Sequence, residues 1–478
     1  MNQHGNERKD LRMALLPHQK ALVETFFEPT SNRVLLLRGE VGLGKSVALV
    51  ALAGRLLRER PTSRVLLLVP AALRSMFMEM FHDACTPSLP VDRYVFRELL
   101  DAKTEGDLWP RGTVIVLSRD FAKQPDILDT LAEVHWDLLV VDEAHSFSGT
   151  QGKKALIRIA PSAERVLIAT ATDLDLPALF PMHATQVIEW RRDQVVDHNG
   201  IALTAVPAPV LHEAPFILSQ PELHLIETVA DLCRTIESCA RQGKLTGQIL
   251  LRSLQSSPAA LENTLSRLMA RSDAFDGSQA PQESQEEDLE TDTIPEPMPR
   301  EAADSVIGVA KPALEESAAI EADSKLEAFD RILRDLDARQ APRRICVFTD
   351  HVTTLYYLSA EIEGLGLSCR LFHGGMTPNE RQDSLTSFSE GHGILVGTSA
   401  VMTEGVSIDQ VTDLVLYDVP RSLLLIQQLL GRFDRFGRQN PLNVHVLVPS
   451  NTADGLSASP ISVLRDVLDE RANPQRSR

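Results

Sequence analysis

The stretch RVLLLRGEVGLGKSVALVALAGRLL, residues 33–57, begins with an apolar run typical of a buried strand and ends with one typical of a helix. Between them lies the pattern G-x-x-x-x-G-K-S, formed by Gly39, Gly44, Lys45 and Ser46. Glycines let backbone N–H groups close around phosphate oxygens, and the start of the helix adds positive potential. The stretch therefore predicts an ATP site in which Lys45 reaches the terminal phosphates and Ser46 ligates Mg²⁺.

A second motif, WDLLVVDEAHSFSG at residues 136–149, places two carboxylates at the end of an apolar strand. Open parallel sheets bind ligands at the carboxyl ends of their strands. Asp142 is placed to hold Mg²⁺ through water, and Glu143 is placed to activate the attacking water. Acidic residues also follow many strands in ordinary loops, but the DEAH sequence combined with the glycine loop favours ATP hydrolysis.

Four further positions are weaker candidates for the same site. Gly42 lies inside the glycine loop and is counted with it. Thr170 and Thr172, in LIATATD, end the next strand and could sense the γ-phosphate, although an ordinary polar turn explains them equally well. Gln19, upstream in LLPHQKAL, could read adenine, with a plain surface glutamine as the alternative.

The pattern of strands predicts an α/β fold with parallel sheets. The predicted strands are VLLLRG, RVLLLVP, TVIVLS, WDLLVVDE and RVLIATAT in the first half, and RICVFTD, SCRLFHG, GILVGTS, TDLVLYDV and NVHVLVP in the second. We expect residues 1–190 to form the ATP-binding domain, 191–272 a helical connector, 273–323 an acidic disordered linker, 324–460 a second α/β domain and 461–478 a C-terminal tail.

The formal net charge of −18 is unevenly placed. Residues 273–323 hold 15 Asp and Glu but 2 Lys and Arg, so the rest of the chain carries only −5. That acidic segment has few core-forming residues, which predicts disorder. The global charge therefore does not exclude a nucleic-acid partner for the folded part.

The composition also bears on location. The first ten residues, MNQHGNERKD, are polar throughout and do not resemble a signal peptide. The apolar runs are too short to cross a bilayer, and the five cysteines contain no C-x-x-C pair. We expect a cytoplasmic protein with reduced thiols and no membrane partner.

The run QQLLGRFDRFGR, residues 427–438, follows an apolar strand and contains three arginines. An arginine-rich junction can be a solvated face or can be directed at an anion. Arg432 and Arg435 are three residues apart and so share one face of a helix. Since a guanidinium is always charged and forks onto phosphate oxygens, this spacing favours one anionic target.

Taken in order, these motifs resemble those of superfamily-two helicases and translocases with two RecA-like lobes. The resemblance spans most of the chain and rests on Gln19, GEVGLGKS, VPAALR, DEAH, TAT, FTD, FHGGMTPNERQDSLTSF, GTSAVMTEGVSID and QQLLGRFDRFGR. Within that superfamily the chain resembles the Swi/Snf-type double-stranded-DNA translocases, and among these the bacterial RNA-polymerase-associated, RapA-like ATPases.

The resemblance implies specific roles. Arg432 and Arg435 would act as arginine fingers on ATP held by the other lobe, and Gln428 and Gly405 would contact the nucleotide. The implied function is a motor that couples ATP hydrolysis to lobe closure and moves along duplex DNA. A protein partner in a transcription, repair or defence complex is compatible with it.

Two other functions stay open. One is an RNA-directed helicase, because the DEAH core does not distinguish DNA from RNA. The other is an ATP-switched recruitment subunit of a DNA repair or phage-defence complex. The sequence also departs from the family: TATD replaces the T-x-T-P pattern usual in the Swi/Snf group, and Leu429 stands where many helicases have arginine.

Overall fold

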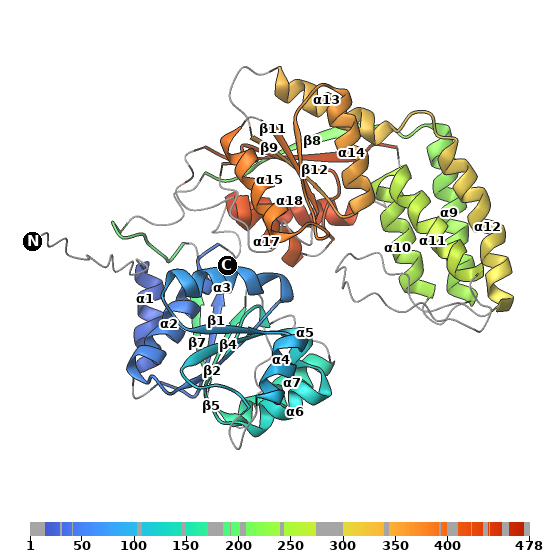
Figure 1. The fold of residues 1–478 in the computed structure, drawn as a ribbon. Helices are drawn as coiled ribbons and strands as arrows, with labels where there is room; N and C mark the ends of the chain where they lie inside the picture. The colour runs from blue at the N-terminus through green and yellow to red at the C-terminus, as the bar shows by residue number, and fades with distance from the viewer. Residues whose placement is uncertain are drawn as a thin grey trace, which may run out of the picture. The chain divides into compact units, whose positions relative to one another are not determined.

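The computed structural model divides the chain into two compact units, Met1–Ala205 and Val206–Arg478 (Figure 1). Structure is described for residues 15–28, 31–40, 42–102, 108–144, 150–170, 185–191, 193–200, 207–239, 243–273, 300–338, 344–391, 393–398, 410–421, 423–433, 438, 440–451 and 458–472. Among the described helices, none combines the length and the apolar character that a membrane span requires.

The first unit alternates strands with helices, as the sequence predicts. Its elements are α1 (Pro17–Phe27), β1 (Val34–Gly39), α2 (Lys45–Glu59), β2 (Arg64–Val69), the 3₁₀ turn η1 (Ala71–Leu73), α3 (Arg74–Asp83), β3 (Ser88–Val91), α4 (Arg93–Asp101), β4 (Thr113–Ser118), α5 (Arg119–Ala122), α6 (Pro125–Glu133), β5 (Trp136–Val141), α7 (Thr150–Ile159), η3 (Ala160–Ser162), β6 (Ala163–Thr170) and β7 (Thr185–Trp190). Strands β3 and β7 are not among the predicted ones.

These strands form one seven-stranded sheet in the order β3-β4-β2-β5-β6-β1-β7, and all of its pairs are parallel. Alternate residues of each strand point to opposite faces. In β1, Leu35 and Leu37 pack with α1, α2 and α3, whereas Val34 and Leu36 pack with α4, α5, α6 and α7. Both faces are therefore buried, which explains why the strands read as continuous apolar runs.

The second unit contains a sheet and a bundle of helices (Figure 1). Its elements are β8 (Val210–Phe216), α9 (Gln220–Cys239), α10 (Gly243–Ser256), α11 (Pro258–Asp273), α12 (Arg300–Ala318), α13 (Ser324–Asp337), β9 (Arg344–Thr349), α14 (Val352–Gly364), β10 (Cys369–Phe372), α15 (Pro378–Glu390), β11 (Gly393–Thr398), β12 (Asp413–Leu416), α17 (Leu423–Phe433), β13 (Asn443–Pro449) and α18 (Ala458–Ala472). The sheet order is β10-β11-β9-β12-β13-β8, again with parallel pairs.

This sheet is also covered on both faces. Ile345 and Val347 of β9 pack with α13 and α14, and Cys346 and Phe348 pack with α15, α17 and α18. Helix α13 begins at Ser324, where the Asp323 carboxylate accepts hydrogen bonds from the backbone N–H groups of Lys325 and Leu326.

The predicted disordered linker at 273–323 is wrong for residues 300–318, which form α12. Val306, Ala310 and Ala313 lie on one face of this helix and are buried against α9 and α11. Glu316 accepts a hydrogen bond from Thr228 Oγ1 at 2.8 Å. The prediction relied on the acidic composition of the segment. It did not take account of a stripe of apolar side chains on one helix face, whose burial depends on neighbouring helices. Residues 274–299 lie outside the described part of the chain.

The predicted connector at 191–272 is not purely helical. Residues 210–216 form β8, which pairs with β13 at the edge of the second sheet. Most side chains of β8 are at least partly exposed, so the strand lacks the apolar signal of its neighbours. The rest of this segment is helical, as predicted, in α9, α10 and α11. Ser219 and Glu222 form a reciprocal cap at the start of α9.

The predicted C-terminal tail at 461–478 is also wrong up to residue 472. Helix α18 buries Ile461, Leu464, Val467 and Leu468 against the second unit. Arg465 donates two hydrogen bonds to the carboxylate of Glu213 on β8, at 2.7 and 2.8 Å. These four apolar residues recur at helical spacing, which lets one face of α18 pack inward.

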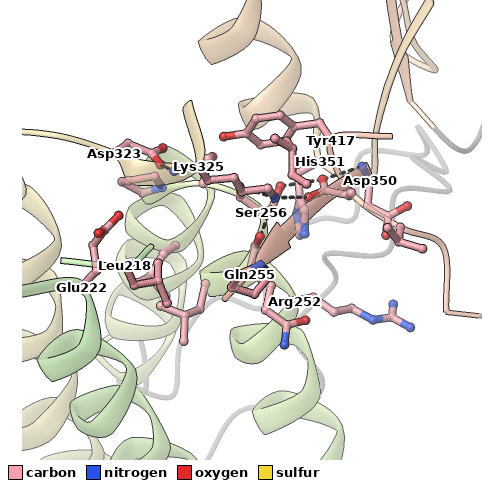
Figure 2. A pocket seen from close by; sticks show the side chains of 18 of the residues that line it. Leu218, Glu222, Arg252, Gln255, Ser256, Asp323, Lys325, Asp350, His351 and Tyr417 are labelled. Atoms are coloured by element: carbon pink, nitrogen blue, oxygen red, sulfur yellow. Dashed lines mark hydrogen bonds and ion pairs between the residues drawn. The ribbon is translucent and has the colours of Figure 1, made fainter. Parts of the chain in front are cut away.

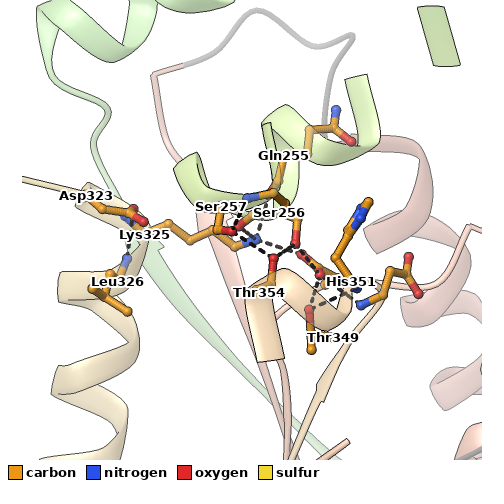
Figure 3. A network of polar contacts seen from close by, with 12 residues as sticks. Gln255, Ser256, Ser257, Asp323, Lys325, Leu326, Thr349, His351 and Thr354 are labelled. Atoms are coloured by element: carbon orange, nitrogen blue, oxygen red, sulfur yellow. Dashed lines mark hydrogen bonds and ion pairs between the residues drawn. The ribbon is translucent and has the colours of Figure 1, made fainter. Parts of the chain in front are cut away.

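Helices α9, α10, α11 and α12 pack together as a helical bundle. A buried polar network joins this helical bundle to the second sheet (Figure 3). Lys325 Nζ donates to the Asp418 carboxylate at 2.9 Å and to the backbone carbonyl of Ser256 at 3.1 Å. Ser256 Oγ and Thr349 Oγ1 donate to the same carboxylate, at 2.7 and 2.6 Å. Because Ser256 ends α10 and Asp418 follows β12, the network links the bundle to the carboxyl edge of the sheet.

Candidate nucleotide site

The glycine loop between β1 and α2 has the backbone that the sequence motif requires. Gly42 and Gly44 have φ angles of 89° and 74°, a region that glycine adopts without strain. Gly44 is also the N-cap of α2, and no side chain caps this helix end. A Cβ on Gly44 would lie 2.3 Å from Gln19 Nε2. The loop therefore needs glycine here for both conformation and space, and it leaves the N–H groups of the first helical turn to an anion.

Lys45 begins α2 and turns back over this loop. Its ammonium donates to the Gly39 carbonyl at 2.6 Å and to the Glu40 carbonyl at 3.3 Å, and the side chain is buried. A Cβ on Gly39 would come within 3.3 Å of Lys45 Cδ, so glycine lets the lysine lie flat against the loop. Ser46 follows in the first turn and is partly exposed. The phosphate-binding role of Lys45 and the Mg²⁺-binding role of Ser46 stay predictions.

Gln19, together with His18 and Trp190, which were not predicted from the sequence, supports the glycine loop. Gln19 is buried, and its amide donates to the carbonyls of Leu43 and Gly44, each at 3.3 Å. His18 Nε2 lies 3.0 Å from the Leu43 carbonyl, and its ring meets Trp190 edge-on. Burial lowers the pKa of His18, against the opposing effect of that hydrogen bond. Gln19 thus holds the loop, and its contact with adenine stays a prediction.

Asp142 and Glu143 leave the carboxyl end of β5 at a sharp bend. The Asp142 N–H donates to the Leu68 carbonyl at 2.9 Å, and the Asp142 carboxylate accepts from the Glu143 N–H at 3.0 Å. Glu143 has a φ of 48°, which is unusual for a residue other than glycine. Such a conformation costs about 1–3 kcal/mol, and it is concentrated at functional sites.

The strand order brings these residues to one edge of the sheet. β1, β6 and β5 are consecutive neighbours, so Gly39, Thr170 and Asp142 all lie at the carboxyl ends of adjacent parallel strands. Neighbouring strands are about 4.8 Å apart, which places Asp142 roughly 10 Å from the loop strand. Thr170 is fully buried. Thr172 lies outside the described residues.

The donor set fits a nucleotide with magnesium. Mg²⁺ is usually bound by one or two protein oxygens together with waters and substrate phosphates. The Ser46 hydroxyl and the Asp142 carboxylate are oxygen donors of this kind, near a loop that suits phosphate. Among the described residues no cluster of three or more His, Cys, Asp or Glu side chains could hold a metal alone.

In the second unit the arginine-rich run is partly helical. Gln428 and Arg432 are one helical turn apart on α17 and are partly exposed. Leu429, Leu430 and Phe433 are buried beneath them. Leu429 occupies a core position, which explains why an apolar residue is tolerated there.

Arg438 has a structural role. It donates to the Phe433 carbonyl at the end of α17 at 3.0 Å, to the Asn440 carbonyl at 2.8 Å and to the Val411 carbonyl. The predicted site residues Arg435 and Gly405 lie outside the described part of the chain.

Comparisons with known proteins agree with these two units. The SNF2-related domain matches residues 18–176, and the helicase conserved C-terminal domain matches residues 324–438. Together the two matches cover the glycine loop, the DEAH sequence and α17. They do not cover the helices α9 to α12.

Whole-chain relatives include the RNA polymerase-associated protein RapA of Cronobacter sakazakii, 24% identical over 484 residues, which are 93% of this chain and 49% of the relative. RapA of Vibrio vulnificus is 25% identical over 502 residues, 94% of this chain and 49% of the relative. The chain thus spans about half the length of these relatives. The Hef helicase domain of Pyrococcus furiosus has a similar fold, with a TM-score of 0.51, 17% identity, and 91% and 95% of the two chains covered.

Proposed function

Because this chain belongs to the Swi/Snf-like branch of the superfamily-two helicases, with two RecA-like lobes, we propose that it is an ATP-dependent nucleic-acid motor. The observation that carries the proposal is the carboxyl edge of the first sheet. There a left-handed glycine loop and a lysine folded over it follow β1, and a strained Asp142–Glu143 pair follows β5, beyond β6 along the same edge. A cradle for phosphate beside a carboxylate pair supports hydrolysis as well as binding.

Each residue of this edge has a defined part in the proposed reaction. The loop N–H groups bind the phosphates, and Lys45 exchanges its loop carbonyls for phosphate oxygens. Ser46 and Asp142 would hold Mg²⁺, which would supply positive charge against the phosphates. Glu143 positions the attacking water and accepts its proton. Thr170 and Thr172 report the γ-phosphate to the rest of the lobe.

The second lobe contributes through α17 and the residues that follow it. We assign Arg432 and Arg435 as arginine fingers that stabilise charge on the transferring phosphoryl group, with Gln428 and Gly405 beside the nucleotide. Closure of the lobes would then couple hydrolysis to movement along the backbone of a nucleic acid.

Replacing Arg432 by alanine should lower the rate of ATP hydrolysis strongly while ATP still binds. The matched control is Arg331→Ala, which removes an exposed arginine on α13.

Duplex DNA is the proposed track, because the first lobe matches the SNF2-related domain. Backbone phosphates would supply most of the affinity, so binding should weaken steeply as salt rises.

The relatives are named as RNA polymerase-associated proteins, and a transcription complex is the partner class that this name suggests. Co-migration with purified RNA polymerase on a size-exclusion column would test that partner.

The decisive experiment measures ATP hydrolysis by the full chain alone and with double-stranded DNA, single-stranded DNA or RNA, at two salt concentrations. We expect stimulation by duplex DNA above all. Stimulation by RNA above all would instead identify an RNA-directed helicase. ATP binding without stimulation by any nucleic acid would contradict the motor and favour an ATP-switched recruitment subunit.

Two variants establish that hydrolysis belongs to the described site. Lys45→Ala should abolish hydrolysis, because the terminal phosphates lose their cation. Lys20→Ala removes an exposed lysine of α1, which pairs with Glu24 at 3.8 Å, and should leave hydrolysis unchanged. Equal activity of Lys45→Ala and the wild type would show that the measured ATPase is a contaminant.

A further inference from the structure

A cavity of about 160 Å³ lies within the second unit, between the helical bundle and the sheet (Figure 2). Its walls come from α9, α10 and α11, from the carboxyl ends of β9 and β12, and from the start of α18. It is separate from the glycine loop, which belongs to the first unit. The apolar part of its lining includes Leu218, Leu225, Ile226, Leu254, Ile320 and Ile461.

The size of the cavity sets the size of a ligand. An apolar cavity of roughly 150 Å³ admits a molecule such as benzene. The apolar walls would therefore accept one aromatic ring or one branched alkyl group, which is too small for a nucleotide. A larger ligand would have to extend out of the apolar part of the cavity towards solvent, past charged side chains of the lining.

The charged residues of the lining fall into two groups. Lys325 and Asp418 already satisfy one another and accept or donate several further hydrogen bonds, so they form part of the wall. Arg252 of α10 and Arg421 after β12 are different. Arg421 donates to the Gln255 side chain, while Arg252 is partly exposed. Within the described part of the chain, Arg252 makes no hydrogen bond or ion pair.

The two guanidinium groups influence each other electrostatically. Both line the same cavity. Burial and, next, the charge of Arg252 lower the pKa of Arg421. Asp350 is the nearby carboxylate that offsets them. At this end of the cavity Arg252 and Arg421 stand beside one carboxylate, that of Asp350. The other lining carboxylates, those of Glu222, Asp323 and Asp418, already accept hydrogen bonds from protein groups, so Arg252 and Arg421 are the cations placed to hold an anion.

We propose that this cavity binds a small organic anion, with a ring or branched alkyl body in the apolar part and one carboxylate or phosphate group held by Arg252 and Arg421. A guanidinium binds either group through two parallel hydrogen bonds. A ligand in this position would touch both the bundle and the sheet, and would stabilise their junction.

Ligand-observed NMR by saturation transfer, on the full chain, tests the proposal with simple probes. Benzoate and phenyl phosphate combine a ring with an anion, benzyl alcohol keeps the ring without the charge, and inorganic phosphate keeps the charge without the ring. We expect titratable binding of benzoate or phenyl phosphate, with benzyl alcohol at least about tenfold weaker because it lacks the charge-assisted hydrogen bonds. The stronger of the two anions identifies the head group, and inorganic phosphate should fail to displace it. Equal binding of benzoate and benzyl alcohol, or no binding of either anion, would overturn the proposal.

Three variants locate the binding. Arg252→Gln should weaken the anion about tenfold, and Ile226→Trp should abolish binding by filling the apolar part. Arg267→Gln, an exposed arginine of α11 that does not line the cavity, is the matched control and should bind as the wild type does. Equal weakening by Arg267→Gln would show that the anion is attracted only by general surface charge. Circular dichroism melting confirms that each variant is folded, and full binding by a folded Ile226→Trp variant would exclude this cavity.

Discussion

The carboxyl edges of the two sheets differ in how a strand is connected to the helix that follows it. In the first unit five residues, 40–44, connect β1 to α2, and glycine backbone forms the surface. In the second unit only Asp350 and His351 connect β9 to α14, and side chains fill the edge. Asp418, at the end of β12, accepts hydrogen bonds there from three neighbouring groups and an ion pair from Lys325.

This difference supports the proposed phosphate site at the first edge, whereas the second edge joins the helices to the sheet. A glycine loop presents N–H groups that have no side chain above them, so an anion can approach the backbone. At the second edge every oxygen of the Asp418 carboxylate has a partner. Burial opposes its ionisation, yet the charges of Lys325 and His351 hold the pKa of Asp418 below its ordinary value. The same fold thus supports binding or attachment according to loop length and side chains.

The largest effect is expected at the first edge. Glu143→Gln should lower the rate of ATP hydrolysis about 10²–10⁴-fold, because an amide cannot accept the proton of the attacking water. Binding of ATP should remain, because the loop and Lys45 are untouched. Stopped hydrolysis assays and nucleotide titration measure the two quantities, with Glu164→Gln on the exposed end of β6 as the control. A variant that hydrolyses ATP normally would remove Glu143 from the mechanism.

A comparable effect on stability is expected at the second edge. Lys325→Ala should lower the free energy of unfolding by about 3–5 kcal/mol, because it leaves the buried Asp418 carboxylate without its cation. Hydrogen exchange should rise around residues 253–257 and 344–350, and stay unchanged around β1 and α2. Lys311→Ala, at an exposed position of α12, serves as the control. A loss of less than about 1 kcal/mol, as for an exposed pair, would mean that the network does not hold the joint.

A smaller effect on ATP binding is expected in the glycine loop, where backbone strain and a steric clash at Gly44 can be measured separately. Gly44→Ala should weaken ATP binding by about 1–3 kcal/mol, since the new Cβ meets Gln19 at a positive φ. Gly200→Ala is the matched control, because Gly200 has a φ of 79° and nothing within 4 Å of its added Cβ. Adding Gln19→Ala to Gly44→Ala removes the clash and should restore part of the affinity. No restoration in the double variant would assign the whole effect to backbone strain.

The smallest effect concerns pH. Burial, followed by the negative charge of Asp418, raises the pKa of Asp350 from 3.8 to about 6, although His351, Arg252 and Arg421 oppose the shift. A raised carboxyl pKa means that the folded state holds the proton longer, so this contribution to stability is lost as pH rises from about 4 to about 6. Asp350→Asn should then be about 1 kcal/mol more stable than the wild type at pH 7.5, after allowance for partial exposure.

Urea unfolding at pH 7.5 and at pH 4.5 measures this difference. The gain from Asp350→Asn should shrink at the lower pH, where Asp350 of the wild type is itself protonated. Asp335→Asn, an exposed position on α13, should show no such trend. A gain that is equal at both pH values would show that ionisation of Asp350 is not its cause.

The sequence by itself determined the local features of this protein. The ten predicted strands, the loop that needs glycine at position 44, and the strand end at Asp142 follow from apolar runs and from residue types whose backbone preferences are local. Helix α13 and the cap at Ser219 are equally local, because a few neighbouring residues decide them. The motif order was also enough to indicate the family.

Only the tertiary structure decided the features that depend on distant partners. Strand β8 is fixed by β13, more than two hundred residues away, and α12 is fixed by the helices that bury its small apolar side chains. The same holds for Trp190 behind the glycine loop and for the junction of Lys325 with Asp418. Their burial is a property of contacts between segments far apart in the chain, and no local pattern of residues records such contacts.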